Sequence, residues 1–101
     1  MAVDIRWLDQ AKDDILSILA YISFDNPKAA AAYVSAIEKS CEKLSQFPES
    51  GRVFNETYRV LVIRNHVVLY RYDAGARKVT VARVIDGRRD IAALLRDDEL
   101  H

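Results

Sequence analysis

The sequence predicts an α+β fold, a hairpin of two helices packed on a small, mostly antiparallel sheet, in the order β-α-α-β-β-β with a short helix at the end. Apolar residues recur at spacings of three and four between residues 8 and 44, which is the period of a helix with one buried face. They recur at every second position between residues 58 and 85, which is the period of a strand. Short connections join these strands, so we expect them to pair antiparallel.

A short strand and the two helices are expected in the first half of the chain. Residues 3–7 alternate apolar and charged side chains, as a strand with one buried face does. The first helix is expected to begin near Asp9, interpreted as its N-cap, and to end before Asn26. Asn26 is the expected N-cap of the second helix, with Pro27 at its first position and an end near residues 48–51. The apolar stripes of the helices predict four core residues: Ile15, Leu19, Ile37 and Leu44.

Three antiparallel strands follow, and their expected positions are residues 58–63, 67–72 and 78–85. The turns between them are expected at residues 64–66 and 73–76, and Gly75 in the second turn is able to take a positive φ. Residues 89–95 are expected to form a short last helix, and residues 96–101 a frayed tail. The length of the chain predicts a single domain spanning residues 1–101.

Composition excludes several classes of protein. Half of the 101 residues are hydrophobic, which is too large a share for a disordered chain. The single cysteine cannot pair within the chain, which excludes a disulfide scaffold. No apolar run approaches the ~18–20 residues of a membrane span, and Asp4 stands where a signal peptide needs an apolar core. We therefore expect a cytoplasmic protein that does not contact the membrane.

The formal net charge is zero, but the charges are unevenly distributed. Residues 1–50 carry five bases and eight acids, whereas residues 51–101 carry ten bases and seven acids. All ten bases of the second half lie between Arg52 and Arg96, together with four acids, and nine of the ten are arginines. The planar guanidinium of arginine presents its N–H donors in a fork that matches carboxylate and phosphate groups. This half is therefore either a surface for an anionic partner or a solvated basic face with internal ion pairs.

The sequence does not indicate a site for a metal, a cofactor or covalent catalysis. Cys41 falls in the apolar stripe of the second helix, where we expect a core thiol, and His66 falls in a turn, where we expect it to be solvated. Neither has further ligands at a metal-binding spacing, and the three glycines do not form a phosphate-binding loop. We therefore predict no metal, no cofactor and no catalytic residue.

Arg83 needs a partner. In an alternating strand over residues 78–85 it shares a face with apolar side chains, and an unpaired charge in such surroundings is very costly. The partner is either a local acid, such as Asp90 or Glu56, or an acid or phosphate of another molecule.

Several stretches together resemble one protein family. In chain order they are Trp7 with Ala11 and Ile15; Tyr21-Ile22 with Pro27 and Ala30; Leu44, Pro48 and Gly51-Arg52; Arg59 and Leu61; Leu69-Tyr70-Arg71; and Val84-Ile85-Asp86-Gly87-Arg88-Arg89-Asp90. Their order and spacing over residues 3–95 resemble the ParE branch of the RelE/ParE superfamily, the toxins of type II toxin–antitoxin modules. The fold that this resemblance implies agrees with the fold predicted above.

The resemblance implies one of two mechanisms. RelE-like members are similar to ribosome-dependent mRNA endonucleases, which use basic residues and a Tyr or His near the end of the last strand for acid–base chemistry on the ribose 2′-hydroxyl. ParE-like members resemble non-enzymatic poisons of DNA gyrase. Here residues 84–101 contain no Tyr and one terminal His, and the loop 49–58 offers Arg52 without a lysine pair. These features favour the gyrase inhibitor, with the mRNA endonuclease and a degenerate, non-toxic binding module as alternatives.

The resemblance also implies partners and contact residues. The partners are DNA gyrase and a ParD-like antitoxin with an acidic C-terminal segment, which forms a hetero-oligomer with the toxin and carries any contact to operator DNA. The residues predicted for target contact and toxicity are Arg88, Arg89 and Arg52. The residues predicted to contact the antitoxin are Arg59, Arg71 and Arg83.

Overall fold

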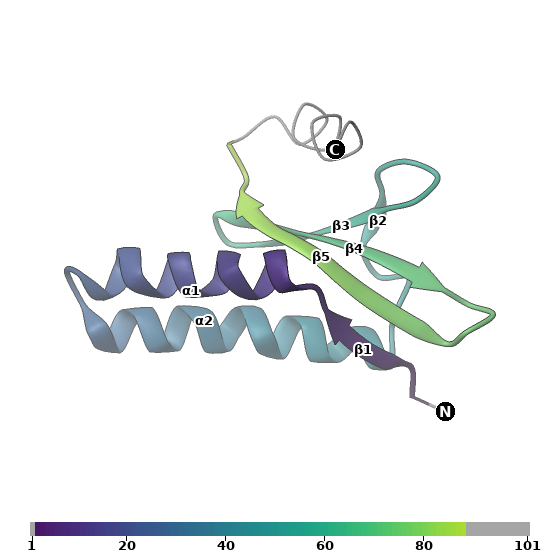
Figure 1. Ribbon diagram of the computed structural model, residues 1–101, viewed down its shortest axis with the longest axis horizontal. Helices are drawn as coiled ribbons and strands as arrows, with labels where there is room; N and C mark the ends of the chain where they lie inside the picture. The colour runs from purple at the N-terminus through teal and green to yellow at the C-terminus, as the bar shows by residue number, and fades with distance from the viewer. Residues whose placement is uncertain (1, 89–101) are drawn as a thin grey trace.

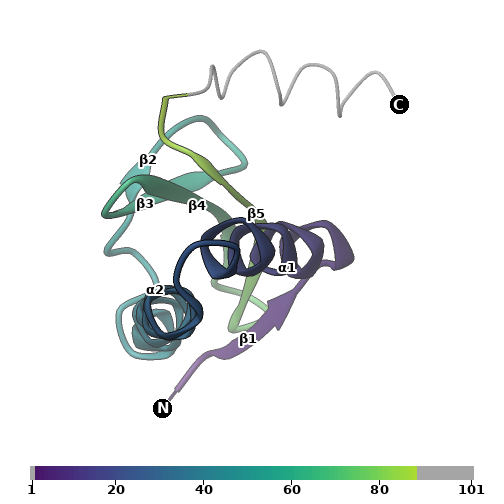
Figure 2. The same cartoon turned by 90° about the vertical axis from the view of Figure 1, so that its left-hand side faces the viewer.

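The computed structural model describes residues 2–88 and confirms the α+β class. The elements are β1 (Asp4–Trp7), α1 (Asp9–Ser23), α2 (Pro27–Glu42), the 3₁₀ helix η1 (Lys43–Ser45), β2 (Arg52–Val53), β3 (Arg59–Ile63), β4 (His66–Asp73) and β5 (Lys78–Asp86). The five strands form one sheet in the order β1-β5-β4-β3-β2, in which β1 runs parallel to β5 and all other pairs are antiparallel. The helices lie side by side against the sheet, and the end where they connect projects beyond it (Figures 1 and 2).

Some elements differ from the predicted ones. β2 was not predicted, because its two residues are too few to show a period, and it pairs with the first residues of β3. α2 ends at Glu42, before the expected end near residues 48–51, and η1 continues the chain as a tighter helical turn. The predicted last helix, residues 89–95, and the predicted tail, residues 96–101, lie outside the described residues.

The two helices begin in different ways. Asn26 caps α2 as predicted, because its Oδ1 accepts a hydrogen bond at 3.1 Å from the backbone N–H three residues on, and Pro27 opens the helix. The N-cap of α1 is Leu8 instead of Asp9, and no side chain caps it. The Leu8 N–H still bonds to the Val81 carbonyl at 2.9 Å, which prolongs the strand pairing and keeps Leu8 extended. Within residues 2–88, neither helix has the length and apolar character that a membrane span needs.

The main core lies between the helices and the sheet. Ile37 and Leu44 are fully buried, as predicted. Ile15 packs against the core as a partly buried side chain, and Leu19 is also only partly buried, so the burial predicted for these two residues is only partial. Cys41 is a buried core residue, and burial raises the pKa of its thiol to about 12, which keeps the thiol protonated and unreactive.

At each of the two turns between antiparallel strands β3, β4 and β5, an arginine has the left-handed backbone conformation. Arg64, between β3 and β4, and Arg77, between β4 and β5, both have a φ of 54°, whereas no described glycine has a positive φ. Gly75 is therefore not the residue that takes a positive φ at the second turn. The Asp73 carboxylate accepts a hydrogen bond from the Ala76 N–H at 3.1 Å, which orders the turn around Gly75 and leaves the left-handed step to Arg77.

A β-bulge changes the alternation of β5. The pairing with β4 shifts after Leu69, where β5 contributes one extra residue. Val79, Val81 and Val84 therefore all belong to the main core, although the last two are three positions apart. An unbroken alternation would place Arg83 on the same face as Val79 and Val81. Because of the bulge, Val84 takes that place in the main core instead.

Candidate functional site

A groove of about 1080 Å³ opens between the helical hairpin and the end of the sheet, and we call it the hairpin groove. Its walls come from α1, from Tyr33 on α2, from residues 62 and 64–67 around the β3–β4 turn, and from residues 83–88 at the end of β5. Polar and charged side chains gather where the turn meets the end of β5. No group of three or more His, Cys, Asp and Glu side chains within residues 2–88 is placed to hold a metal ion.

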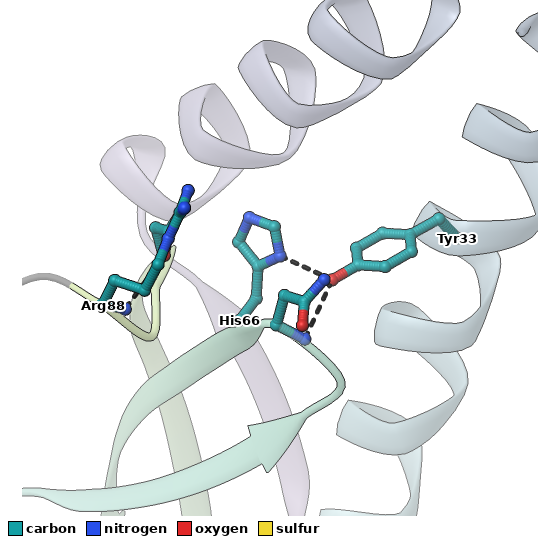
Figure 3. A network of polar contacts seen from close by, with 5 residues as sticks. Tyr33, His66 and Arg88 are labelled. Carbon is teal, nitrogen blue, oxygen red and sulfur yellow. Dashed lines mark hydrogen bonds and ion pairs between the residues drawn. The ribbon is translucent and has the colours of Figure 1, made fainter.

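His66 and Tyr33 form the centre of this polar end (Figure 3). The Tyr33 Oη and the His66 Nδ1 lie 2.6 Å apart, and the Asn65 N–H donates to the Tyr33 Oη at 3.4 Å. The two rings meet edge to face, with their centroids 5.4 Å apart. His66 is thus half-buried, not a solvated turn residue as predicted, because β4 already begins at His66 and α2 brings Tyr33 against it.

Arg88 lies on the other side of His66 and binds Asp86 (Figure 3). The Asp86 carboxylate accepts hydrogen bonds from the backbone N–H, the Nε and the Nη2 of Arg88 at 2.9, 3.1 and 2.9 Å. The side-chain bond is the largest of the effects that hold the pKa of Asp86 well below its usual range. The charge of Arg88 is therefore balanced within the chain, although 91% of its side chain is exposed.

The surroundings of His66 keep its imidazole neutral. Burial is the largest effect on the pKa of His66 and lowers it from the ordinary value of 6.5. The Asp86 carboxylate, which pairs with His66 across the strands, opposes this shift, and the Arg88 guanidinium adds to it. A neutral imidazole has one nitrogen without a proton, so Nδ1 can accept the hydrogen bond from Tyr33 at pH 7.

We expect acid to weaken the fold through His66. Because its pKa is lower in the folded chain than in the unfolded chain, the unfolded chain binds the proton more readily. The stabilising contribution is fully present above pH 6.5 and is lost as the pH falls from there through the folded-state pKa. The Tm of the wild-type protein should fall between about pH 7.5 and about pH 5.5 by more than that of His66→Gln. Equal decreases in both proteins would remove His66 as the cause.

Arg83 reaches the groove from β5 and is held by Asp14 of α1. Its Nε and Nη2 donate to the two carboxylate oxygens at 2.8 and 3.2 Å, and the same carboxylate accepts the Val84 N–H at 2.9 Å. β1 pairs only with the first half of β5, so Asp14 takes the place of a strand partner beyond the end of β1. The local acids considered from sequence were Asp90, which lies outside the described residues, and Glu56, whereas Asp14 is 69 positions away.

The Arg59 side chain is hydrogen-bonded to backbone carbonyls of its own chain. Its Nη1 donates to the carbonyls of Glu49 and Gly51 at 3.2 and 2.9 Å, which fastens the loop before β3. Its role in antitoxin contact remains a prediction, and any such contact would have to share the guanidinium with these carbonyls.

The structure brings together only part of the predicted set of arginines. Arg83 and Arg88 line the hairpin groove, whereas Arg52 and Arg71 are exposed on β2 and β4 and do not line it. Arg89 lies outside the described residues. The roles predicted for these residues in target and antitoxin contact stay predictions.

Neither Tyr33 nor Asp14 was recognised from sequence as a site residue. Tyr33 fits the apolar stripe of its helix, and Asp14 fits the acidic first turns of α1. Their partners, His66 and Arg83, are 33 and 69 positions away. A single sequence offers no signal at such separations.

The chain is similar to known proteins along most of its length. Residues 5–91 match the family model described as the ParE toxin of the type II toxin–antitoxin system, parDE. The chain belongs to the ParE toxin family. The protein is thus a type II toxin of the ParE/RelE superfamily, as the resemblance predicted. A protein of Sinorhizobium fredii described as a candidate toxin, Y4kP, is 34% identical over 80 residues, which cover 76% of this chain and 83% of that protein.

Solved structures of ParE-like and RelE-like toxins share the fold of this ParE-family chain. A chain of the chromosomal ParDE system from P. aeruginosa has a TM-score of 0.72 at 19% identity and covers 84% of this chain and 96% of its own. A chain of the toxin–antitoxin complex RelBE2 from Mycobacterium tuberculosis has a TM-score of 0.62 at 21% identity, with coverages of 85% and 99%. The isolated E. coli RelE toxin also has a TM-score of 0.62, at 10% identity, with coverages of 99% and 100%.

Proposed function

We propose that this ParE-family toxin arrests growth by binding DNA gyrase and blocking DNA replication, that it does so without cutting RNA, and that an antitoxin with an acidic C-terminal segment neutralises it. The observation that carries the proposal is the match of residues 5–91 to the ParE toxin model of parDE systems. Toxins that resemble ParE act on gyrase as binding proteins, so the proposal requires a surface and no catalytic group.

The chemistry of the hairpin groove supports a non-catalytic mechanism. Cleavage through a 2′-hydroxyl needs a base for the attacking oxygen and a separate acid for the leaving oxygen. His66, with a lowered pKa, is a candidate base. The phenol nearest to it, Tyr33, is bonded to His66 itself, and the arginines of the groove do not release protons. The other phenol that lines the groove within residues 2–88 is that of Tyr21, which is 84% exposed, so the second proton donor would have to be a solvated side chain.

A second candidate function is cleavage of mRNA on the ribosome. The observation that favours it is the same Tyr33–His66 pair, which lies in one groove with Arg83 and Arg88, cations that suit a phosphate. The fold likeness to RelE-type toxins fits both functions.

Purified components separate the two candidates. We expect the toxin to inhibit supercoiling of relaxed plasmid by gyrase and to leave message on translating ribosomes intact in a primer-extension assay. The double variant Arg88→Ala/Arg89→Ala should inhibit gyrase at least about tenfold more weakly, because truncated arginines are frequent hot spots of binding.

Arg77→Ala is the matched control, because Arg77 is an exposed arginine of the β4–β5 turn that does not line the groove. It should inhibit gyrase as the wild type does. Cleaved message with unaffected gyrase would establish the endonuclease instead, and no effect in either assay would leave a non-toxic binding module.

A further inference from the structure

Arg64 occupies a backbone conformation that does not favour it. Its φ of 54° lies in the left-handed region, where a residue with a Cβ is strained and glycine is not. It stands at the first position of the tight turn between Ile63 and His66, where glycine is the usual residue when the backbone is left-handed. Such strain persists where the surrounding structure holds the residue in place.

The side chain of Arg64 lies on the wall of the hairpin groove. Its guanidinium carbon is 5.5 Å from the centre of the Tyr33 ring, a cation–π contact. Tyr33 is itself held by His66 and by the Asn65 N–H, so the ring on which Arg64 rests is fixed in place. The turn therefore presents a positioned guanidinium at the polar end of the groove.

Arg64 differs from the other groove arginines in its charge balance. Arg83 is paired with Asp14, and Arg88 is paired with Asp86. Within residues 2–88, no acidic side chain forms an ion pair with Arg64, whose contact is the Tyr33 ring. Among the arginines of the groove, Arg64 is therefore the one best placed to form an ion pair with a carboxylate of another molecule.

The rest of the groove points to a peptide as that molecule. Tyr21 and Val62 line the groove and are 84% and 63% exposed, and Ile18 and Ile22 of α1 line it as well. A nucleic acid backbone would instead meet the carboxylates of the two ion pairs and one unbalanced cation, which is poor complementarity for a row of phosphates.

We propose that Arg64 determines the specificity of the hairpin groove for an acidic, partly apolar peptide segment: its guanidinium receives a carboxylate of the peptide while Tyr33 supports it from behind, and apolar side chains of the peptide pack between α1 and Val62. The identification of this peptide as the acidic C-terminal segment of the antitoxin rests on the proposed function. Arg64 would thus make the carboxylate contact that the sequence suggested for Arg83, whose guanidinium is bound to Asp14.

The test uses two arginines with the same strain. Arg64→Gly and Arg77→Gly both relieve a left-handed arginine with a φ of 54°, and both add the same freedom to the unfolded chain. Arg64→Gly also loses the cation–π contact with Tyr33, so its Tm should lie slightly below that of Arg77→Gly. The probe is a fluorescein-labelled peptide with the acidic C-terminal sequence of the antitoxin encoded beside the toxin gene. Arg64→Gly should weaken its binding roughly tenfold or more, and Arg77→Gly less than about twofold. Changing the acidic residues of the peptide to amides should abolish the difference between Arg64→Gly and the wild type.

Equal peptide affinities of Arg64→Gly and the wild type would overturn the proposal, as would equal losses in the Arg64 and Arg77 variants, since these would reflect net charge alone. If Arg64→Gly weakened binding of a single-stranded RNA oligonucleotide and left peptide binding unchanged, the turn would belong to a nucleic-acid site and the proposal would also be wrong. Failure of the gyrase proposal is a separate result, because it is measured on supercoiling and leaves the peptide affinities as they are.

Discussion

Replacing Ile37 by Ala is expected to lower the free energy of unfolding by ~2–5 kcal/mol. Ile37 lies on α2 and has no exposed surface, and its neighbours in the main core come from both the helices and the sheet. Truncation therefore loses the transfer free energy of the buried methyl groups and leaves a cavity between the two layers. Urea unfolding followed by circular dichroism measures the change as a lower midpoint with an unchanged slope.

Leu19→Ala is the matched control for Ile37→Ala. Both side chains were predicted from the helical stripes, but Leu19 is only partly buried and does not belong to the main core. Truncation of Leu19 removes less buried apolar surface than truncation of Ile37, so the decrease in the free energy of unfolding should be clearly smaller. A loss for Leu19→Ala as large as that for Ile37→Ala would contradict the arrangement of the two layers.

Gly51→Ala is expected to be about as damaging, with a loss of about 2–5 kcal/mol from overpacking and broken hydrogen bonds together. A Cβ on Gly51 would lie 2.5 Å from the Oη and 2.6 Å from the Cε1 of Tyr70. Tyr70 is fully buried, and its hydroxyl donates to the Pro48 carbonyl at 2.9 Å and accepts the Gly51 N–H at 2.8 Å. Burial raises the pKa of this phenol, which keeps the donor protonated. The added methyl group must therefore displace a ring that has no room to move.

Two further variants check this explanation of Gly51. In Gly75→Ala the new Cβ would meet the Asp73 carboxylate at 3.4 Å, an ordinary contact on an exposed turn, so stability should hardly change. Gly51→Ala combined with Tyr70→Phe removes the closest clashing atom, so the double variant should lose less than the sum of the single losses. Thermal unfolding of the wild type, Gly51→Ala, Gly75→Ala, Tyr70→Phe and the double variant measures both comparisons, and strict additivity would argue against the clash.

The sequence by itself determined the two helices, the long strands and their order, although not the two-residue strand β2. The spacing of apolar residues predicted both helices and the three long strands, because burial of one face imposes a period that is visible in any short window. Asn26 and Pro27 predicted the start of α2, because a cap acts within three residues. Ile37 and Leu44 were identified as core residues for the same local reason. The family resemblance came from the same chain and was confirmed.

Tertiary structure alone decided the site. The pairs that build the groove join residues 33 and 69 positions apart, Tyr33 with His66 and Asp14 with Arg83. The bulge in β5 moved the buried position from Arg83 to Val84, and the pairing of Leu8 with β5 moved the start of α1. These outcomes depend on how the helical hairpin lies against the sheet. That arrangement is set by a packing free energy to which segments far apart in the sequence contribute. Periodicity and caps act within a few residues and carry no information about such contacts.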